Sequence, residues 1–108
     1  MRVTQSEIEA LVLAITPFLN GNNAELRLYG SRVNDDLKGG DIDLLLLVEH
    51  ENTGDAIKLQ KHLLLSEIKK QLGDRKIDVL IAARDTMADH TFLTMIFPES
   101  VVLYNWYV

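Results

Sequence analysis

Apolar residues recur along this chain at two spacings, and the alternation between them divides it into helices and strands. From Ile8 to Leu19 they recur at helical spacing, and Thr4-Gln5-Ser6-Glu7 just before them matches a capping box. A second helical pattern covers residues 55–72, where Gly73 provides a C-terminal cap. These two segments are predicted to be the long helices of the domain.

Strand-like apolar segments separate and follow the helices. They are predicted at residues 25–29, 41–48 and 76–83. Residues 50–54 are predicted to form a loop, and Thr86 is predicted to cap a last short helix that Pro98 ends. Residues 101–104 are interpreted as a final short strand or an apolar tail.

The order of these elements predicts one α/β domain over residues 1–108, a small mixed β-sheet flanked by helices. The 41–48 segment lacks polar alternation after its first residues, which is typical of a central strand. The connection across residues 30–40 is too short for a helical crossover, so the first two strands are expected to be antiparallel.

Composition narrows the class of protein. With 47% hydrophobic and 25% charged residues, the composition is that of a globular protein. The chain has no cysteine, so a disulfide, a thiolate metal site and a cysteine nucleophile are excluded. The absence of cysteine fits a cytoplasmic protein. The N-terminus lacks an apolar signal core and no apolar run is long enough for a membrane span. A net charge of −5 disfavours nucleic acid as a partner. Four lysines are interpreted as a solvated helix face: Lys58, Lys61, Lys69 and Lys70.

Two acids begin the most apolar strand, although Asp is disfavoured in strands. Asp41 and Asp43 point to the same face because side chains alternate along a strand, and they repel each other unless a cation lies between them. Asp78 lies in the third predicted strand and could join them. Each acid alone could equally be a solvent-exposed strand residue, but together they predict a site for Mg²⁺ or Mn²⁺.

Gly30-Ser31 precedes these acids and offers a place for an anion. Glycine lets the backbone approach a phosphate closely, and Ser31 could donate from its hydroxyl and its N–H. By itself the dipeptide is an ordinary turn. Beside a metal site it indicates a nucleotide, since metals held by carboxylates bridge phosphate oxygens.

The combined pattern is Gly30-Ser31, nine residues, Asp41-Ile42-Asp43-Leu44, and then Lys76-Ile77-Asp78-Val79-Leu80. It resembles the minimal nucleotidyltransferases of the polymerase-beta-like superfamily over residues 24–84. The resemblance implies the polymerase-beta-like nucleotidyltransferase fold. It also implies that Asp41 and Asp43 bind two divalent metals, that Asp78 is a third ligand and a base, and that Gly30 and Ser31 hold the triphosphate.

The loop between the two motifs departs from the pattern of many relatives. Gly40 stands where they have serine, and the loop is one residue shorter. Arg32 and Lys38 are the two cations within it that could contact phosphate.

The resemblance also implies a reaction and a partner. The reaction is Mg²⁺-dependent transfer of a nucleoside monophosphate, AMP from ATP, to a hydroxyl. The acceptor is expected on a protein partner, because the family pairs with helical HEPN-type proteins in toxin–antitoxin systems. The rival hypothesis is a non-catalytic antitoxin module that neutralises its partner by contact. The sequence leaves open whether the chain also forms a homo-oligomer. The aromatic C-terminus, Tyr104, Trp106 and Tyr107, either folds onto the core or forms an interface.

Overall fold

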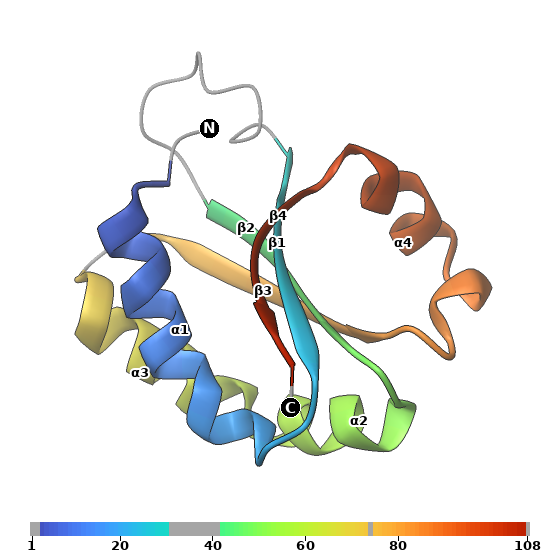
Figure 1. Cartoon of the computed structure of the whole chain (residues 1–108), viewed down its shortest axis with the longest axis horizontal. Helices are drawn as coiled ribbons and strands as arrows, with labels where there is room; N and C mark the ends of the chain where they lie inside the picture. Colours follow the sequence, from blue (N-terminus) through green and yellow to red (C-terminus); the bar gives the residue numbers. More distant parts are fainter. Residues whose placement is uncertain (1–2, 31–41, 74, 108) are drawn as a thin grey trace.

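A four-stranded mixed sheet lies between two layers of helices in the computed structural model, which describes residues 3–30, 42–73 and 75–107 (Figure 1). Its strands are β1 (Ala24–Tyr29), β2 (Ile42–Val48), β3 (Ile77–Ala83) and β4 (Val101–Trp106). Their order across the sheet is β3-β2-β1-β4. β1 pairs antiparallel with both β2 and β4, and β2 pairs parallel with β3. The mixed sheet, the interior position of β2 and the antiparallel β1–β2 pair confirm the predictions.

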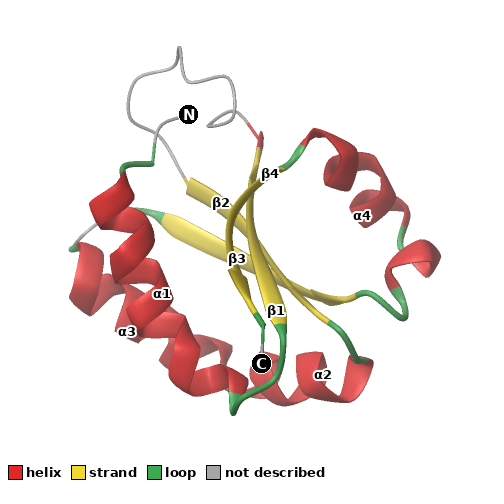
Figure 2. Ribbon diagram, in the orientation of Figure 1, coloured by secondary structure: helices red, strands yellow, loops and turns green. Residues whose placement is uncertain are grey.

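The two faces of the sheet are covered unequally (Figure 2). Helices α1 (Gln5–Leu19), α2 (Glu51–Leu59) and α3 (Lys61–Leu72) cover one face. The other is covered by the short helix α4 (Thr91–Ile96) and two 3₁₀ turns, η2 (Met87–Asp89) and η3 (Phe97–Glu99). In the described part of the chain no helix is both long and apolar enough to cross a lipid bilayer.

Strand β2 supplies the centre of both apolar layers. Leu44 and Leu46 belong to the cluster beneath α1, α2 and α3, whereas Leu45 and Leu47 belong to the cluster beneath α4. These four side chains are at most 1% exposed. Asp43 therefore lies on the α4 face, because it shares its side of the strand with Leu45.

Helix α1 begins with the predicted capping box. The Thr4 Oγ1 accepts from the Glu7 N–H at 3.2 Å, and the Thr4 N–H donates to Glu7 Oε1 at 2.9 Å. These bonds satisfy two backbone donors that a helix start leaves unpaired. The helix continues through Pro17 and ends at Leu19, where Asn20 adopts φ 50°.

The predicted second helix was wrong in two respects. Residues 51–54 are helical and not a loop, and the segment forms two helices separated at Gln60, which has φ −109° and ψ 16°. Gly54, interpreted as a loop residue, is buried against the sheet: a Cβ there would lie 3.5 Å from a methyl group of Val48. A small residue at this position lets the start of α2 approach the sheet closely.

The C-terminal third also differs from the prediction. Thr86 precedes η2 and makes no capping hydrogen bond from its side chain, and α4 begins only at Thr91 after His90. Strand β4 extends to Trp106, because its pairing with β1 continues to the Ala24–Trp106 pair. Trp106 Nε1 donates to Thr16 Oγ1 of α1 at 2.8 Å, so this aromatic side chain packs back on the domain. Tyr104 and Tyr107 are 40% and 70% exposed.

Replacing the cap should lower stability without changing the fold. Thr4→Ala removes the acceptor for the Glu7 N–H, and we expect the free energy of unfolding to fall by about 1 kcal/mol in urea titrations. Gln5→Ala, an exposed change one residue along, should leave it within about 0.5 kcal/mol. Equal losses in both variants would contradict the capping role.

Candidate active site

Three polar side chains form a row across adjacent strands at one end of the sheet. Tyr29 of β1 is opposite Asp43 of β2, and Asp43 is opposite Asp78 of β3. Residues opposite one another across paired strands point to the same face, and neighbouring strands lie about 4.8 Å apart. The phenol and the two carboxylates therefore share the α4 face. The register places Asp43 and Asp78 side by side, and their role as site residues stays a prediction.

Gly30 lies directly against this row. Its φ is +80°, a conformation that L side chains rarely adopt, and a Cβ at this position would lie 2.8 Å from Asp43 Oδ2. Glycine is thus favoured at this position for two reasons: the positive φ and the closeness of the Asp43 carboxylate. The absent side chain lets the Gly30 backbone pack closely against the Asp43 carboxylate.

The negative charges of the row affect the pKa of the Tyr29 phenol. Burial raises the pKa of Tyr29 above its ordinary value of 10.0, and the negative charges of Asp43 and Asp78 raise it further. Phenolate formation would place a third negative charge beside two carboxylates, which is unfavourable. Tyr29 accordingly stays a neutral phenol at physiological pH.

Lys61 of α3 reaches the outermost acid of the row. Its Nζ lies 3.3 Å from Asp78 Oδ1, and the two side chains are 37% and 62% exposed. An exposed pair of this kind contributes at most about 1 kcal/mol, so Asp78 can exchange Lys61 for another partner at little cost. The interpretation of Lys61 as part of a solvated face was incomplete. No sequence pattern indicates this contact, because it depends on how α3 docks beside β3.

The layer over the row is attached through a cluster of charged and aromatic side chains. Arg27 donates to Ser100 Oγ at 2.6 Å and lies over the Phe97 ring, 4.2 Å from its centroid. Glu25 forms ion pairs with Arg27 and with Arg84. Glu25 is 8% exposed, and its two ion pairs offset the burial of its charge. The cluster ties the chain after α4 to β1.

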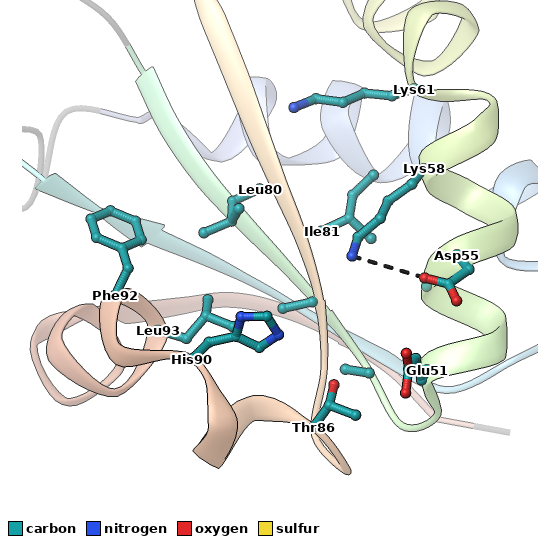
Figure 3. Close-up of a pocket in the computed structure, with 13 residues that line it drawn as sticks. Glu51, Asp55, Lys58, Lys61, Leu80, Ile81, Thr86, His90, Phe92 and Leu93 are labelled. Carbon is teal, nitrogen blue, oxygen red and sulfur yellow. Dashed lines mark ion pairs between the residues drawn. The ribbon is translucent and has the colours of Figure 1, made fainter.

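A cavity of about 340 Å³ lies beside the row, between the helices and the outer strand (Figure 3). One wall is formed by α2 and the start of α3, with Lys58 and Lys61. The opposite wall is formed by α4, with Phe92 and Leu93, and β3 forms the floor. Phe92 also packs edge-to-face on Tyr29 with ring centroids 6.2 Å apart, so this side chain contacts the row and lines the cavity as well. Sequence reasoning missed this role of Phe92, since only the folded chain brings α4 beside β1.

The other predicted site residues, Ser31, Arg32, Lys38 and Asp41, lie outside the described residues. Within residues 3–30, 42–73 and 75–107 no group of three His, Cys, Asp or Glu side chains could hold a metal. Asp43 and Asp78 nevertheless offer hard oxygen donors of the kind that Mg²⁺ and Mn²⁺ prefer. Gly30 packs against the Asp43 carboxylate, so the acid lies directly beside the glycine turn that the sequence assigned to a phosphate.

A mixed sheet with carboxylates in register beneath a glycine turn is an arrangement suited to an enzyme that handles phosphate groups. The chain belongs to the nucleotidyltransferase domain family, whose family model matches residues 11–101. The polymerase-beta-like resemblance and the α/β fold expected from it are thereby confirmed, and the family supports nucleotidyl transfer as the general activity. The narrower minimal-nucleotidyltransferase assignment stays a prediction. No curated protein and no solved structure matches the chain significantly.

The Tyr29 phenol can report the charge of the row. With Tyr104 and Tyr107 replaced by phenylalanine, Tyr29 is the sole tyrosine, and its ionisation can be followed by ultraviolet absorbance. Asp43→Asn and Asp78→Asn should each lower the pKa of Tyr29, because each removes a negative charge that opposes the phenolate. Glu9→Gln, an exposed change in α1, should leave it unchanged. An unaltered titration in both Asn variants would place the acids away from Tyr29.

Two glycine substitutions separate backbone strain from contact with Asp43. Gly21 and Gly30 both have φ +80°, but a Cβ at Gly21 would meet nothing within 4 Å. Each alanine variant should lose about 1–2 kcal/mol of stability from the left-handed backbone. Gly30→Ala should lose more, because Asp43 must move, and it should also shift the Tyr29 titration. If the two variants are indistinguishable in thermal melts and titration, the close approach is not a constraint.

Proposed function

We propose that this protein transfers a nucleoside monophosphate, AMP from ATP, to a hydroxyl group of a protein partner. The observation that supports this best is the in-register pair Asp43 and Asp78, with Gly30 packed against Asp43, in a chain of the nucleotidyltransferase family. A helical HEPN-type protein is the partner class that the sequence resemblance implies. The cytoplasm is the compartment in which we place the reaction.

In this proposal Asp43 and Asp78 would hold Mg²⁺ or Mn²⁺ together with Asp41, which the sequence places two residues before Asp43. When bound, the metal would supply positive charge against the phosphate oxygens of the NTP. Gly30 and Ser31 would hold the triphosphate through the backbone N–H groups of the turn. Arg32 and Lys38 are the loop cations that would contact it.

The acceptor would approach Asp78, the more exposed of the two described acids. Transfer joins the acceptor oxygen to the α-phosphorus, breaks the bond to the β-phosphate and releases pyrophosphate. The carboxylate of Asp78 would accept the proton of the attacking hydroxyl. Lys61 would leave Asp78 as the metal and the acceptor arrive, because the exposed ion pair is weak.

Removal of one carboxylate should abolish both metal binding and transfer. Without nucleotide, Mg²⁺ should stabilise the wild type by about 2.7 kcal/mol when its free concentration is 100 times the dissociation constant. Asp43→Asn should lose this response in thermal melts, while Asp89→Asn, an exposed change in η2, should keep it. Asp43→Asn should also transfer no label from ATP labelled at the α-phosphate to a HEPN-type helical partner of the proposed class.

The combination of readouts decides between the two hypotheses. An identical Mg²⁺ response in the wild type and Asp43→Asn would exclude a shared metal site. A tight complex with the partner, formed without transfer of label by the wild type, would favour the non-catalytic module that acts by contact.

A further inference from the structure

The two edges of the sheet differ in exposure. At the β3 edge, Val79, Ile81 and Ala83 are at most 4% exposed, so this strand is hard to reach from outside. At the other edge no residue of β4 is buried, and Val102 and Tyr104 are 41% and 40% exposed. Among the described strands, β4 pairs with β1 alone (Figure 1). The outward backbone groups of β4 are therefore accessible to a further strand.

The sequence of β4 offers little of the protection that exposed edges usually carry. Residues 101–107 include no charged residue and no proline. One irregularity is present, because the register with β1 skips Leu103 between Val102 and Tyr104. From Tyr104 to Trp106 the register is regular again. An added strand can therefore follow the second half of this edge.

Two aromatic side chains lie on one face of this regular part. Tyr104 is opposite Leu26 and Trp106 is opposite Ala24, and both partners belong to the apolar cluster beneath α1. Residues opposite one another across paired strands share a face, so both rings lie on the α1 face. They pack edge-to-face with centroids 4.9 Å apart. The edge thus carries an aromatic pair at the border of the sheet, where only one side of it meets this chain's own strands.

The surface beside the aromatic pair continues onto α1. Thr16, which accepts the hydrogen bond of Trp106, lines a groove of about 200 Å³ together with Leu19 of α1 and residues 104–107. None of the residues that line this groove is charged. Leu13 lies one helical turn before Thr16 and is 64% exposed. An uncharged surface therefore extends from the β4 edge to the exposed side of α1.

Charge favours a second copy of this chain as the occupant. With a net charge of −5, two copies repel each other wherever acidic surfaces meet, whereas the β4 surface brings no like charges together. On the α4 face the nearest charges, Glu25 and Arg27, are already paired with each other. A second β4 also brings an edge with the same unpaired backbone groups. Two identical antiparallel strands are related by a two-fold axis perpendicular to the sheet, which keeps α1 on the same side in both copies.

We infer that two copies of this chain associate through antiparallel β4 strands into one continuous sheet, with the two-fold axis at Asn105. Asn105 is the centre of the regular segment from Tyr104 to Trp106. With the axis there, Tyr104 of each copy lies opposite Trp106 of the other, and Asn105 lies opposite itself. Both aromatic pairs share the α1 face, and cross-strand aromatic pairs stabilise a sheet. An axis at Tyr104 would instead bring the irregular Leu103 into the centre of the pairing.

This inference goes beyond the proposed function and does not depend on it. Tyr29, at one end of β1, belongs to the row of the candidate site, whereas Ala24, at the other end, pairs with Trp106. The row also faces α4, and the aromatic pair faces α1. The dimer therefore leaves Asp43 and Asp78 accessible in both copies.

Sedimentation velocity over a dilution series measures the association. The wild type should change from dimer to monomer as it is diluted, and Tyr104→Phe should behave in the same way. Tyr104→Glu places a carboxylate against Trp106 of the other copy twice in each dimer, and should weaken the dimer at least about tenfold. Leu63→Glu, a matched change of a 49% exposed residue of α3, should not. A wild type that is monomeric at every concentration, or equal weakening by both Glu variants, would overturn the inference.

Single cysteines test the position of the axis, and they still decide if Tyr104→Glu does not fold. The chain has no cysteine of its own, so each variant can form a disulfide only between two copies. Opposed residues in antiparallel strands have Cα atoms about 4.5–5.5 Å apart, which a disulfide can span. Under mild oxidation Asn105→Cys should form a covalent dimer, whereas Val102→Cys, on the same face of β4, should stay monomeric in non-reducing electrophoresis. Equal cross-linking of both variants, or none at Asn105, would overturn the inference.

The inference and the proposed function fail separately. A wild type that transfers label but never dimerises would overturn the inference and leave the transferase intact. A wild type that dimerises through β4 but transfers no label would do the reverse.

Discussion

The parallel pairing of β2 with β3 is the constraint on which the site depends. Side chains alternate along both strands, so a slip of one residue would move Asp78 to the face covered by α1, α2 and α3. That slip would bury a carboxylate among leucines and expose Val79 and Ile81, which are 0% and 4% exposed in the native register. Burying an unpaired charge and exposing apolar side chains are both costly. The apolar pattern that builds the core therefore also aligns the acids.

The unequal covering of the sheet determines how accessible the site is. Three helices seal one face, and Leu64 and Ile68 of α3 are at most 1% exposed there. The other face is covered only by α4 and two single 3₁₀ turns, which leave the Asp43–Asp78 end open. The buried Glu25 and its arginines hold this thin cover in place where little apolar contact is available. The thin cover of the α4 face thus has two consequences: the acids are accessible, and the second apolar layer is small.

Nucleotide and acceptor must reach the reacting atoms from different directions in any transfer between them. The Gly30 turn and the β3 edge lie on opposite sides of the Asp43–Asp78 pair, since Gly30 follows β1 and β3 is the outermost strand. Phe92 contacts Tyr29 at one end of the row, and Lys61 contacts Asp78 at the other. The row therefore adjoins the cavity through two side chains from different elements.

The sequence by itself determined the class of fold, the start of α1 and the central strand, and it singled out Asp43 and Asp78, whose pairing in register the structure supplied. These follow from local patterns: the capping box, the apolar run of β2, and a connection too short for a crossover. The prediction failed at Gln60, because no proline or glycine marks the break between α2 and α3. It also failed at the start of α2, because Gly54 is a helical residue that packs on the sheet. Only the tertiary structure brought Lys61 to Asp78, Phe92 to Tyr29 and the helices to either side of β3. Such contacts join residues distant along the chain, and they depend on docking angles and on which edge of the sheet stays unpaired, which no local pattern encodes.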